Sequence, residues 1–273
     1  MPFSALLDAN VLVPNVLRDT LLRVAEDDLY RPLWSREILA ETRRTILRLR
    51  PEVNAERLDA MFVDMNDTFV DAMVTGHDSL ISDMGNDEGD RHVLAAAITG
   101  RADVIITNNV KDFPASAVDP LHIEVMRPDR FLCLQFDLSP SLVIDVLRRQ
   151  SADTGRAPGK PRLALDDLLE LLRRSGAPTF ASQVLAQLPA ALPRSRSPHR
   201  TSGAPTVKPE VDSLPAHGPA RATKRRTELP SPARRGIDAS RQTRHTPQQR
   251  QRGAVGAELG QLGVDEVGDE LGG

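Results

Sequence analysis

Residues 103–107 read DVIIT, a short continuous run of apolar side chains with a polar residue at each end. Runs of this length are typical of strands that are covered on both faces, as in parallel sheets. A second run, SALL at residues 4–7, ends at Asp8, and together with VLVP at residues 11–14 it suits a buried strand that ends before a helix. Because segments with helical periodicity separate the two runs, the sequence predicts an α/β fold with a central parallel sheet.

On both sides of these runs, apolar residues repeat every three or four positions in several segments. The periodicity predicts further strands over residues 29–34 and 123–126, and helices over residues 15–28, 35–50, 55–73, 90–99 and 128–136. Asn15 and Ser35 are the expected N-caps of the first two helices, and Gly100 is the expected C-terminal stop of the fourth. Cys133 is the single cysteine, which excludes an internal disulfide, and we expect it to be buried as a small apolar residue.

The composition changes after residue 136. Residues 137–189 show helical periodicity only, in segments 142–149, 165–174 and 180–188, so we expect a small helical C-terminal extension behind a domain at residues 1–136. Residues 190–273 are rich in Pro, Arg, Ser, Thr and Gln and lack apolar periodicity. Such a segment buries too little apolar area to offset its ordering entropy, so we expect a disordered tail, unless the end of the reading frame is an artefact.

The net charge of -3 conceals an uneven distribution of charged residues. Acids predominate up to residue 136, whereas bases predominate after residue 190. No apolar run approaches the ~20 residues that a membrane span requires. The start of the sequence also lacks the charged and apolar regions of a signal peptide. We therefore expect a cytoplasmic protein that makes no use of a membrane.

Four acidic residues fall at the ends of predicted elements or in a neighbouring helix: Asp8, Glu41, Asp90 and Asp112. Ligands of an open parallel sheet bind outside the carboxyl ends of its strands, so Asp8 and Asp112 are expected to share one site. Asp90 begins a helix and is expected to point toward the buried side of that helix. Carboxylates gathered in one place repel one another unless a cation bridges them, and a set of oxygen ligands selects Mg²⁺ or Mn²⁺.

Each acid also has a purely structural interpretation. Asp8 suits a turn, Glu41 a solvated helix position, Asp90 a first turn favoured by the helix dipole, and Asp112 a loop. Chemistry of other kinds finds little support, because a phosphate loop of the G-x-x-x-x-G-K type is absent. A zinc site is not expected either, because no zinc-like spacing links Cys133 with the histidines, which include His77, His92 and His122.

Taken in order, four segments resemble the signatures of PIN domains: LDANVL at residues 7–12, WSREILAE at 34–41, DRHVLAAA at 90–97 and ITNNVKDFP at 106–114. The resemblance covers about residues 3–136, and the helical stretch behind it resembles the C-terminal extension of some VapC-type toxins. It implies a PIN-like three-layer domain and an Mg²⁺- or Mn²⁺-dependent endoribonuclease. Its metal ligands and catalytic residues would be Asp8, Glu41, Asp90 and Asp112.

The same resemblance implies further residues of the site. Asn10, Thr107 and Asn108 match polar positions that line such sites, and Asp87 is a candidate outer ligand. Many PIN domains have an Asp two residues after the Thr, where this chain has Asn109. The fourth acid is therefore Asp112, or the site has only three acids.

The resemblance implies an RNA substrate, a cognate antitoxin as protein partner, and a homodimer. An acidic domain must still bind a polyanion, so basic residues near the predicted site are candidates for phosphate contacts, namely Arg43, Arg44, Arg48, Arg91 and Lys111. Solvated helix faces are an equally good interpretation of these positions. Two other functions stay open: a catalytically weak PIN module that acts mainly by binding a partner, and a PIN nuclease of RNA processing that is not a toxin.

Overall fold

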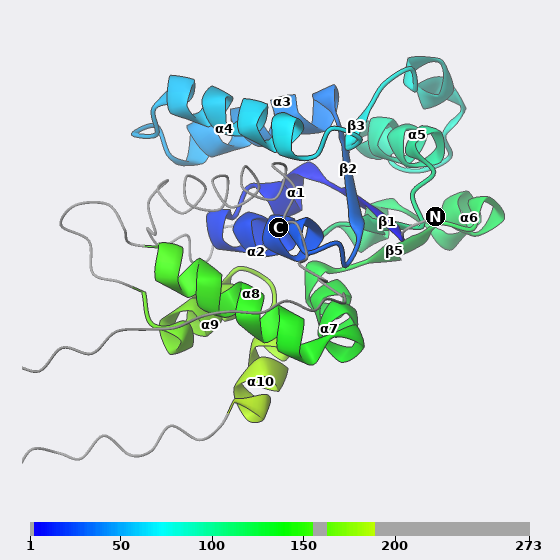
Figure 1. Cartoon of the computed structure of the whole chain (residues 1–273). Helices are drawn as coiled ribbons and strands as arrows, with labels where there is room; N and C mark the ends of the chain where they lie inside the picture. Colours follow the sequence, from blue (N-terminus) through cyan, green and yellow to red (C-terminus); the bar gives the residue numbers. More distant parts are fainter. Residues whose placement is uncertain (1–2, 155–162, 189–273) are drawn as a thin grey trace, which may run out of the picture. The chain divides into compact units, whose positions relative to one another are not determined.

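The centre of the fold is a sheet of five parallel strands in the order β3-β2-β1-β4-β5 (Figure 1). The computed structural model describes residues 3–154 and 163–188. Its strands are β1 (Ser4–Leu7), β2 (Arg31–Ser35), β3 (Met73–Val74), β4 (Val104–Ile106) and β5 (Glu124–Met126). The parallel sheet predicted from the DVIIT and SALL runs is confirmed, because these runs form the neighbouring strands β4 and β1.

Helices connect the strands and cover both faces of the sheet. In chain order they are α1 (Ala9–Leu12), α2 (Asn15–Glu26), α3 (Arg36–Leu49), α4 (Ala55–Thr68), α5 (Arg91–Gly100), α6 (Ala115–Val118) and α7 (Pro128–Leu138). Short 3₁₀ turns are η1 (Asp78–Asp83), η2 (Glu88–Asp90), η3 (Val110–Asp112) and η4 (Asp119–Leu121). None of the helices in the described ranges has both the length and the hydropathy that a membrane crossing requires.

The path of the chain across the sheet explains the three layers. From β1 the chain moves through β2 to β3, and then it crosses back through α5 to β4 and β5. Because crossovers between parallel strands are right-handed, this reversal places α2 and α5 on opposite faces. Helix α5 packs against β1, β2, β3 and β4, and α2 packs against β2. The predicted three-layer α/β domain is therefore confirmed.

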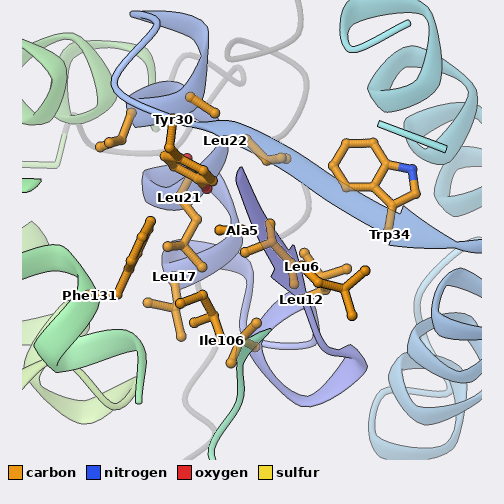
Figure 2. Close-up of a cluster of buried hydrophobic side chains, with 14 of the residues drawn as sticks. Ala5, Leu6, Leu12, Leu17, Leu21, Leu22, Tyr30, Trp34, Ile106 and Phe131 are labelled. Carbon is orange, nitrogen blue, oxygen red and sulfur yellow. The ribbon is translucent and has the colours of Figure 1, made fainter. Parts of the chain in front are cut away.

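Apolar side chains from α2, the strands and α7 fill the core on one face (Figure 2). Leu17 and Leu21 of α2 lie between Phe131 of α7 and Ala5 of β1 (Figure 2). The rings of Tyr30 and Phe131 meet edge to face, with centroids 4.8 Å apart. The Tyr30 hydroxyl donates to the carbonyl of Leu21 at 2.9 Å, so its polar end is satisfied although the ring is buried.

Three local predictions need correction. Asn15 is the first residue of α2 and not its cap, and its side chain accepts a hydrogen bond from the buried Arg18 at 2.7 Å instead. The left-handed residue behind α5 is Arg101, whereas Gly100 is needed for close packing, since a Cβ there would lie 2.8 Å from Val74. Cys133 is only half-buried, because it lies at the margin of the core. The predicted cap Ser35 is confirmed, as it accepts from the Ile38 amide.

The helical extension packs directly on the sheet domain. Its helices are α8 (Pro140–Asp153), α9 (Leu165–Arg174) and α10 (Pro178–Gln187), and they contact α2 and α7. The interface is polar at one side, where Thr20 of α2 donates to Gln150 of α8 at 2.8 Å, and apolar at the other, where Phe136 of α7 meets Phe180 of α10. The residue range 190–273, predicted as a disordered tail, lies outside the described residues.

Candidate active site

The strand order changes direction between β1 and β4. The chain leaves these neighbouring strands toward opposite faces of the sheet, and such a switch point is where open α/β sheets bind their ligands. Leu7 is in register with Ile106, so the residues that follow them, Asp8 and Thr107, come together at the carboxyl ends of the two strands. The amide of Asp8 continues the ladder by donating to the carbonyl of Ile106 at 3.1 Å.

A hydrogen-bond network holds the Asp8 carboxylate at this point. Oδ1 accepts from the amide of Ala9 at 2.6 Å, which makes Asp8 the N-cap of α1. Oδ2 accepts from Nδ2 of Asn10 at 2.6 Å and from the hydroxyl of Thr107 at 2.7 Å. Asn10 also donates to Oγ1 of Thr107 at 2.9 Å and accepts from the amide of Asn108 at 2.9 Å. These bonds fix one orientation of the carboxylate, and they tie the ends of β1 and β4 to each other.

Asp8 is buried, so ionisation of its carboxylate requires a large desolvation free energy. The pKa of Asp8 is raised to about 6. Desolvation is the main cause, the negative charges of Glu41 and Asp112 act in the same direction, and the hydrogen bond from Thr107 opposes them. Buried carboxylates whose pKa is raised by neighbouring carboxylates are typical of functional sites.

Asp90 faces the same cluster from the start of α5. Burial raises the pKa of Asp90 to about 7, and the charges of Asp8, Asp112, Glu41 and Asp87 all act in the same direction. Asp87 and Asp90 share one segment, whereas Asp8, Glu41 and Asp112 come from three others, and the fold brings all five within electrostatic reach of one another. The predicted grouping of the acids is therefore consistent with the fold, and their role as ligands stays a prediction.

Helix α3 contributes a second row of polar contacts beside this acid cluster. Glu41 lies on α3 with Oε2 3.7 Å from Nε2 of His92, and Nδ1 of His92 is 3.0 Å from the carbonyl of Gly89. One turn earlier, Oε2 of Glu37 lies 3.3 Å from Nε2 of the buried His77. From the sequence, both histidines were considered only as zinc ligands, and these two pairs with glutamates were not predicted. Their signal was the spacing of four between Glu37 and Glu41, which puts both on one helix face.

The remaining predicted residues lie in loops beside the carboxyl ends of β1 and β4. Asp112 ends η3, and its carbonyl accepts from the amide of Asp87 at 3.1 Å, so these two acidic loops lie side by side. The side chain of Asp87 is occupied as a cap for Gly89 at 3.0 Å. Asn109 has no carboxylate to offer a metal ion, but its backbone amide donates to Oγ1 of Thr107 at 2.9 Å. The Asn109 backbone thereby joins the network that holds Asp8.

The basic residues predicted to contact phosphate differ in their surroundings. Arg44 is exposed on α3, and Lys111 is exposed in η3. Arg91 is partly buried at the start of α5, with Nε 3.5 Å from the carbonyl of Asn86. Arg43 instead makes a two-pronged ion pair with Asp59 of α4, at 2.6 and 2.9 Å, which engages it away from a substrate. Arg48 is also exposed on α3, so Arg44, Arg48, Arg91 and Lys111 stay candidates.

The chemistry of the cluster fits a hard divalent cation. Its donors are carboxylate and amide oxygens, and the raised pKa values of Asp8 and Asp90 mark a lack of positive charge among them. Within residues 3–154 and 163–188, no three His, Cys, Asp or Glu side chains stand in an arrangement that holds one ion. The hydrogen bonds to both oxygens of Asp8 keep its carboxylate turned toward Ala9, Asn10 and Thr107.

The raised pKa of Asp90 predicts how stability depends on pH in protein that is stripped of metal. Folded Asp90 titrates at about 7 and unfolded Asp90 near 3.8, so its contribution favours folding below the lower value and is lost as the pH rises toward the higher one. Asp90→Asn mimics the protonated side chain. It should raise the melting temperature at pH 8 by about 2–4 °C, which corresponds to roughly 1 kcal/mol once solvent screening of this half-exposed group is discounted.

At pH 4 the same substitution should leave the melting temperature unchanged, because the carboxyl is then largely protonated in the folded protein. Asp119→Asn, at an exposed position in η4, controls for a general effect of charge removal. The measurement is thermal unfolding in EDTA at both pH values. An equal shift at pH 4 and pH 8, or the same shift for the control, would contradict the electrostatic explanation.

Comparisons with known proteins agree with this fold. A family model described as PIN domain matches residues 4–111, and one described as VapC50 C-terminal domain matches residues 128–186. A curated relative from Mycobacterium tuberculosis (strain ATCC 25618 / H37Rv), named "Putative ribonuclease VapC50", is 37% identical over 122 residues, which are 45% of this chain and 69% of the relative. No solved structure matches the chain.

The chain, whose parallel sheet has acidic residues at its switch point, therefore belongs to the PIN-domain class. More narrowly, the chain belongs to the VapC family of PIN-domain proteins, and both the sheet domain and the helical extension match models of this group. The resemblance inferred from the four signature segments is confirmed.

Proposed function

We propose that the protein is a metal-dependent endoribonuclease and the toxin of a VapBC toxin-antitoxin pair. The observation that carries this proposal is the convergence of Asp8 and Asp90, with Glu41 and Asp112 in electrostatic reach, at the switch point of the sheet. The name of the curated relative describes a ribonuclease, which supports a nuclease over a module that only binds a partner. The antitoxin, the RNA substrate and a homodimer come with the VapC resemblance.

Asp8, Glu41, Asp90 and Asp112 are the residues that would hold Mg²⁺ or Mn²⁺. When bound, the ion supplies Lewis-acid stabilisation of charge on the phosphate and a more acidic water as nucleophile. Cation binding would also remove the electrostatic cost that raises the pKa of Asp8 and Asp90. Oxygen-only ligands favour these two ions over zinc.

The other side chains of the site position the acids and the substrate. Asn10 and Thr107 each donate to Oδ2 of Asp8, so they fix its orientation before a ligand arrives. Preorganised groups of this kind lower the reorganisation that accompanies reaction. Arg44, Arg48, Arg91 and Lys111 would contact the phosphates of the RNA backbone, because each lies on an element that carries or adjoins one of the acids. Asp87 and Asn108 would line the substrate-binding surface beside the four acids.

Growth tests the toxin assignment. Induction of the wild-type protein in a bacterial host should arrest growth with loss of intact RNA, and co-expression of the cognate antitoxin, expected from a small gene immediately upstream, should restore growth. Asp8→Asn, induced to the same soluble level, should allow growth at the rate of the empty vector, because it lacks the ionised acid. Unimpaired growth with abundant soluble wild-type protein and intact RNA would favour the partner-binding module instead. Arrest that no upstream protein relieves would favour a PIN nuclease of RNA processing.

A further inference from the structure

Helix α1 is a single turn that provides two of the hydrogen bonds to the Asp8 side chain. The amide of Ala9, its first residue, donates to Oδ1 of Asp8 at 2.6 Å, and the side chain of Asn10 donates to Oδ2 at 2.6 Å. A helix of one turn is not stable by itself, because it fixes many backbone angles for few hydrogen bonds. Its bond from the amide of Val13 to the carbonyl of Ala9, at 3.1 Å, therefore needs support from the surrounding structure.

The buried side chain of Arg18, on α2, gives this support at the other end of α1. Its Nη1 donates to the carbonyl of Leu12 at 2.5 Å and, more weakly, to the carbonyl of Val13 at 3.4 Å. Leu12 is the last residue of α1 and is fully buried, so its carbonyl depends on a donor from the protein. Arg18 thus satisfies the C-terminal end of the turn whose N-terminal end is capped by Asp8.

An arginine inside the core is unfavourable unless its contacts offset the burial of its charge. Burial lowers the pKa of Arg18 to about 10, so the guanidinium still carries its charge at pH 7. The charge of Asp19 favours this ionisation, but the carboxylate of Asp19 forms its ion pair with Arg23 at 2.8 Å. The contacts that offset the burial are the bonds of Nη1 to the end of α1, together with the bond that Nη2 donates to Oδ1 of Asn15 at 2.7 Å.

We propose that Arg18 is a positioning residue of the active site: its guanidinium holds α1 in its helical turn, and α1 in turn holds the carboxylate of Asp8. The catalytic interpretation rests on the proposed nuclease function. Arg18 takes no part in the chemistry, because it acts on Asp8 only through α1. A lysine cannot replace it fully, since the fork of an arginine reaches the carbonyl of Leu12 and the side chain of Asn15 at the same time.

Hydrogen exchange at the amide of Val13 reports on α1 directly and needs neither metal nor RNA. In the metal-free full chain, Arg18→Met should speed this exchange about tenfold relative to amides that exchange through global unfolding. The reason is that α1 opens more often when the carbonyl of Leu12 loses its donor. Nuclear magnetic resonance on labelled protein makes the measurement.

Thr20→Val is the matched control, because Thr20 is fully buried on the same helix as Arg18. This substitution removes the hydrogen bonds that the Thr20 hydroxyl donates to Gln150 and to the carbonyl of Val16, neither of which is part of α1. Exchange at Val13 should therefore follow global stability alone in the control. Equal acceleration in the two variants would overturn the inference.

Cleavage of RNA tests the link from α1 to Asp8. Arg18→Met should lower kcat about tenfold relative to Thr20→Val, with KM within about twofold, because Asp8 loses its alignment while the phosphate contacts persist. Arg18→Lys should recover part of this loss, since one donor to Leu12 remains. In an Asn10→Ala background, Arg18→Met should change kcat less than about threefold, because the main connection from α1 to Oδ2 is already gone. Equal kcat for Arg18→Met and Thr20→Val, or a full tenfold loss in the Asn10→Ala background, would overturn the inference.

Affinity for Mn²⁺ alone, measured by titration calorimetry on the full chain, separates this inference from the proposed function. Arg18→Met should bind Mn²⁺ about fivefold more weakly than Thr20→Val, because Asp8 is held less firmly. If the wild-type protein cleaved no RNA but this difference and the faster exchange at Val13 appeared, the positioning role would stand and the nuclease proposal would fail. If Arg18→Met did not accumulate, Asn15→Ala, which removes the acceptor of Nη2, should also speed the exchange at Val13, and unchanged exchange would overturn the inference.

Discussion

Asp8→Asn should reduce RNA cleavage at least a thousandfold, which corresponds to about 4 kcal/mol of transition-state stabilisation. The substitution keeps the size of the side chain and its cap to the amide of Ala9, but it removes the ionised carboxylate at the centre of the acid cluster. A metal site that loses one buried anionic ligand loses both affinity and charge balance. Of the four acids, Asp8 should give the largest loss because it is the most buried and the most firmly oriented.

The fold should survive this change. The substituted amide loses hydrogen bonds to Asn10 and Thr107, but it no longer carries the desolvated charge that raises the pKa of Asp8 to about 6. These effects oppose each other above that pH, so the melting temperature should stay within a few degrees. Asp67→Asn, at an exposed position on α4, should cleave RNA like the wild type. Single-turnover cleavage of a labelled RNA by the three proteins makes the comparison. An Asp8→Asn protein that retained a tenth of the activity would remove Asp8 from the site.

Phe180→Ala should destabilise the whole described unit by about 3–5 kcal/mol. Phe180 of α10 is fully buried, and its ring meets Phe136 of α7 edge to face with centroids 6.1 Å apart. Truncation would leave a cavity at the joint between the helical extension and the sheet domain. At roughly 2–4 °C per kcal/mol for a chain of this size, the melting temperature should fall by about 10 °C.

Leu185→Ala is the matched control on the same helix, because Leu185 is 50% exposed and should cost little. Thermal unfolding followed by circular dichroism should give one transition for each protein, since the extension and the sheet domain share a core. Two separate transitions in Phe180→Ala, with the upper one at the wild-type temperature, would mean that the extension folds independently of the sheet domain.

Periodicity and apolar runs were enough to predict the architecture of the sheet domain. The DVIIT and SALL runs predicted buried parallel strands, and Ser35 predicted the start of α3, because a serine before an amphipathic segment satisfies its free amides. Two predictions were wrong at the shortest elements: residues 11–14 were assigned to a strand although α1 covers Ala9–Leu12, and the helix predicted to residue 73 ends at Thr68, before strand β3. The four-residue helix α6 was not predicted, because an element so short has no periodicity to detect. Helix α1 depends on the cap that Asp8 provides, which is visible only once Asp8 is placed.

The site was predictable only in part, because some of its contacts depend on how distant segments of the chain pair. The acids at the strand ends could be proposed from the sequence because parallel strands present their carboxyl ends at one edge. The hydrogen bonds from Asn10 and Thr107 to Asp8 depend on the register in which β1 pairs with β4, and apolar runs and periodicity do not reveal that register.

Metal-dependent cleavage tests the central claim that these acids form a site for a divalent cation in a ribonuclease. A labelled RNA pool is incubated with the wild-type protein in EDTA, in Mg²⁺ and in Mn²⁺, alongside Asp8→Asn and Asp90→Asn. Cleavage is predicted for the wild type only, and only with metal. In the same samples, Mn²⁺ should raise the melting temperature of the wild type and raise that of each variant less, because ligand binding stabilises the folded state in proportion to its affinity. Cleavage that persists in EDTA, or equal thermal shifts in all three proteins, would contradict the account.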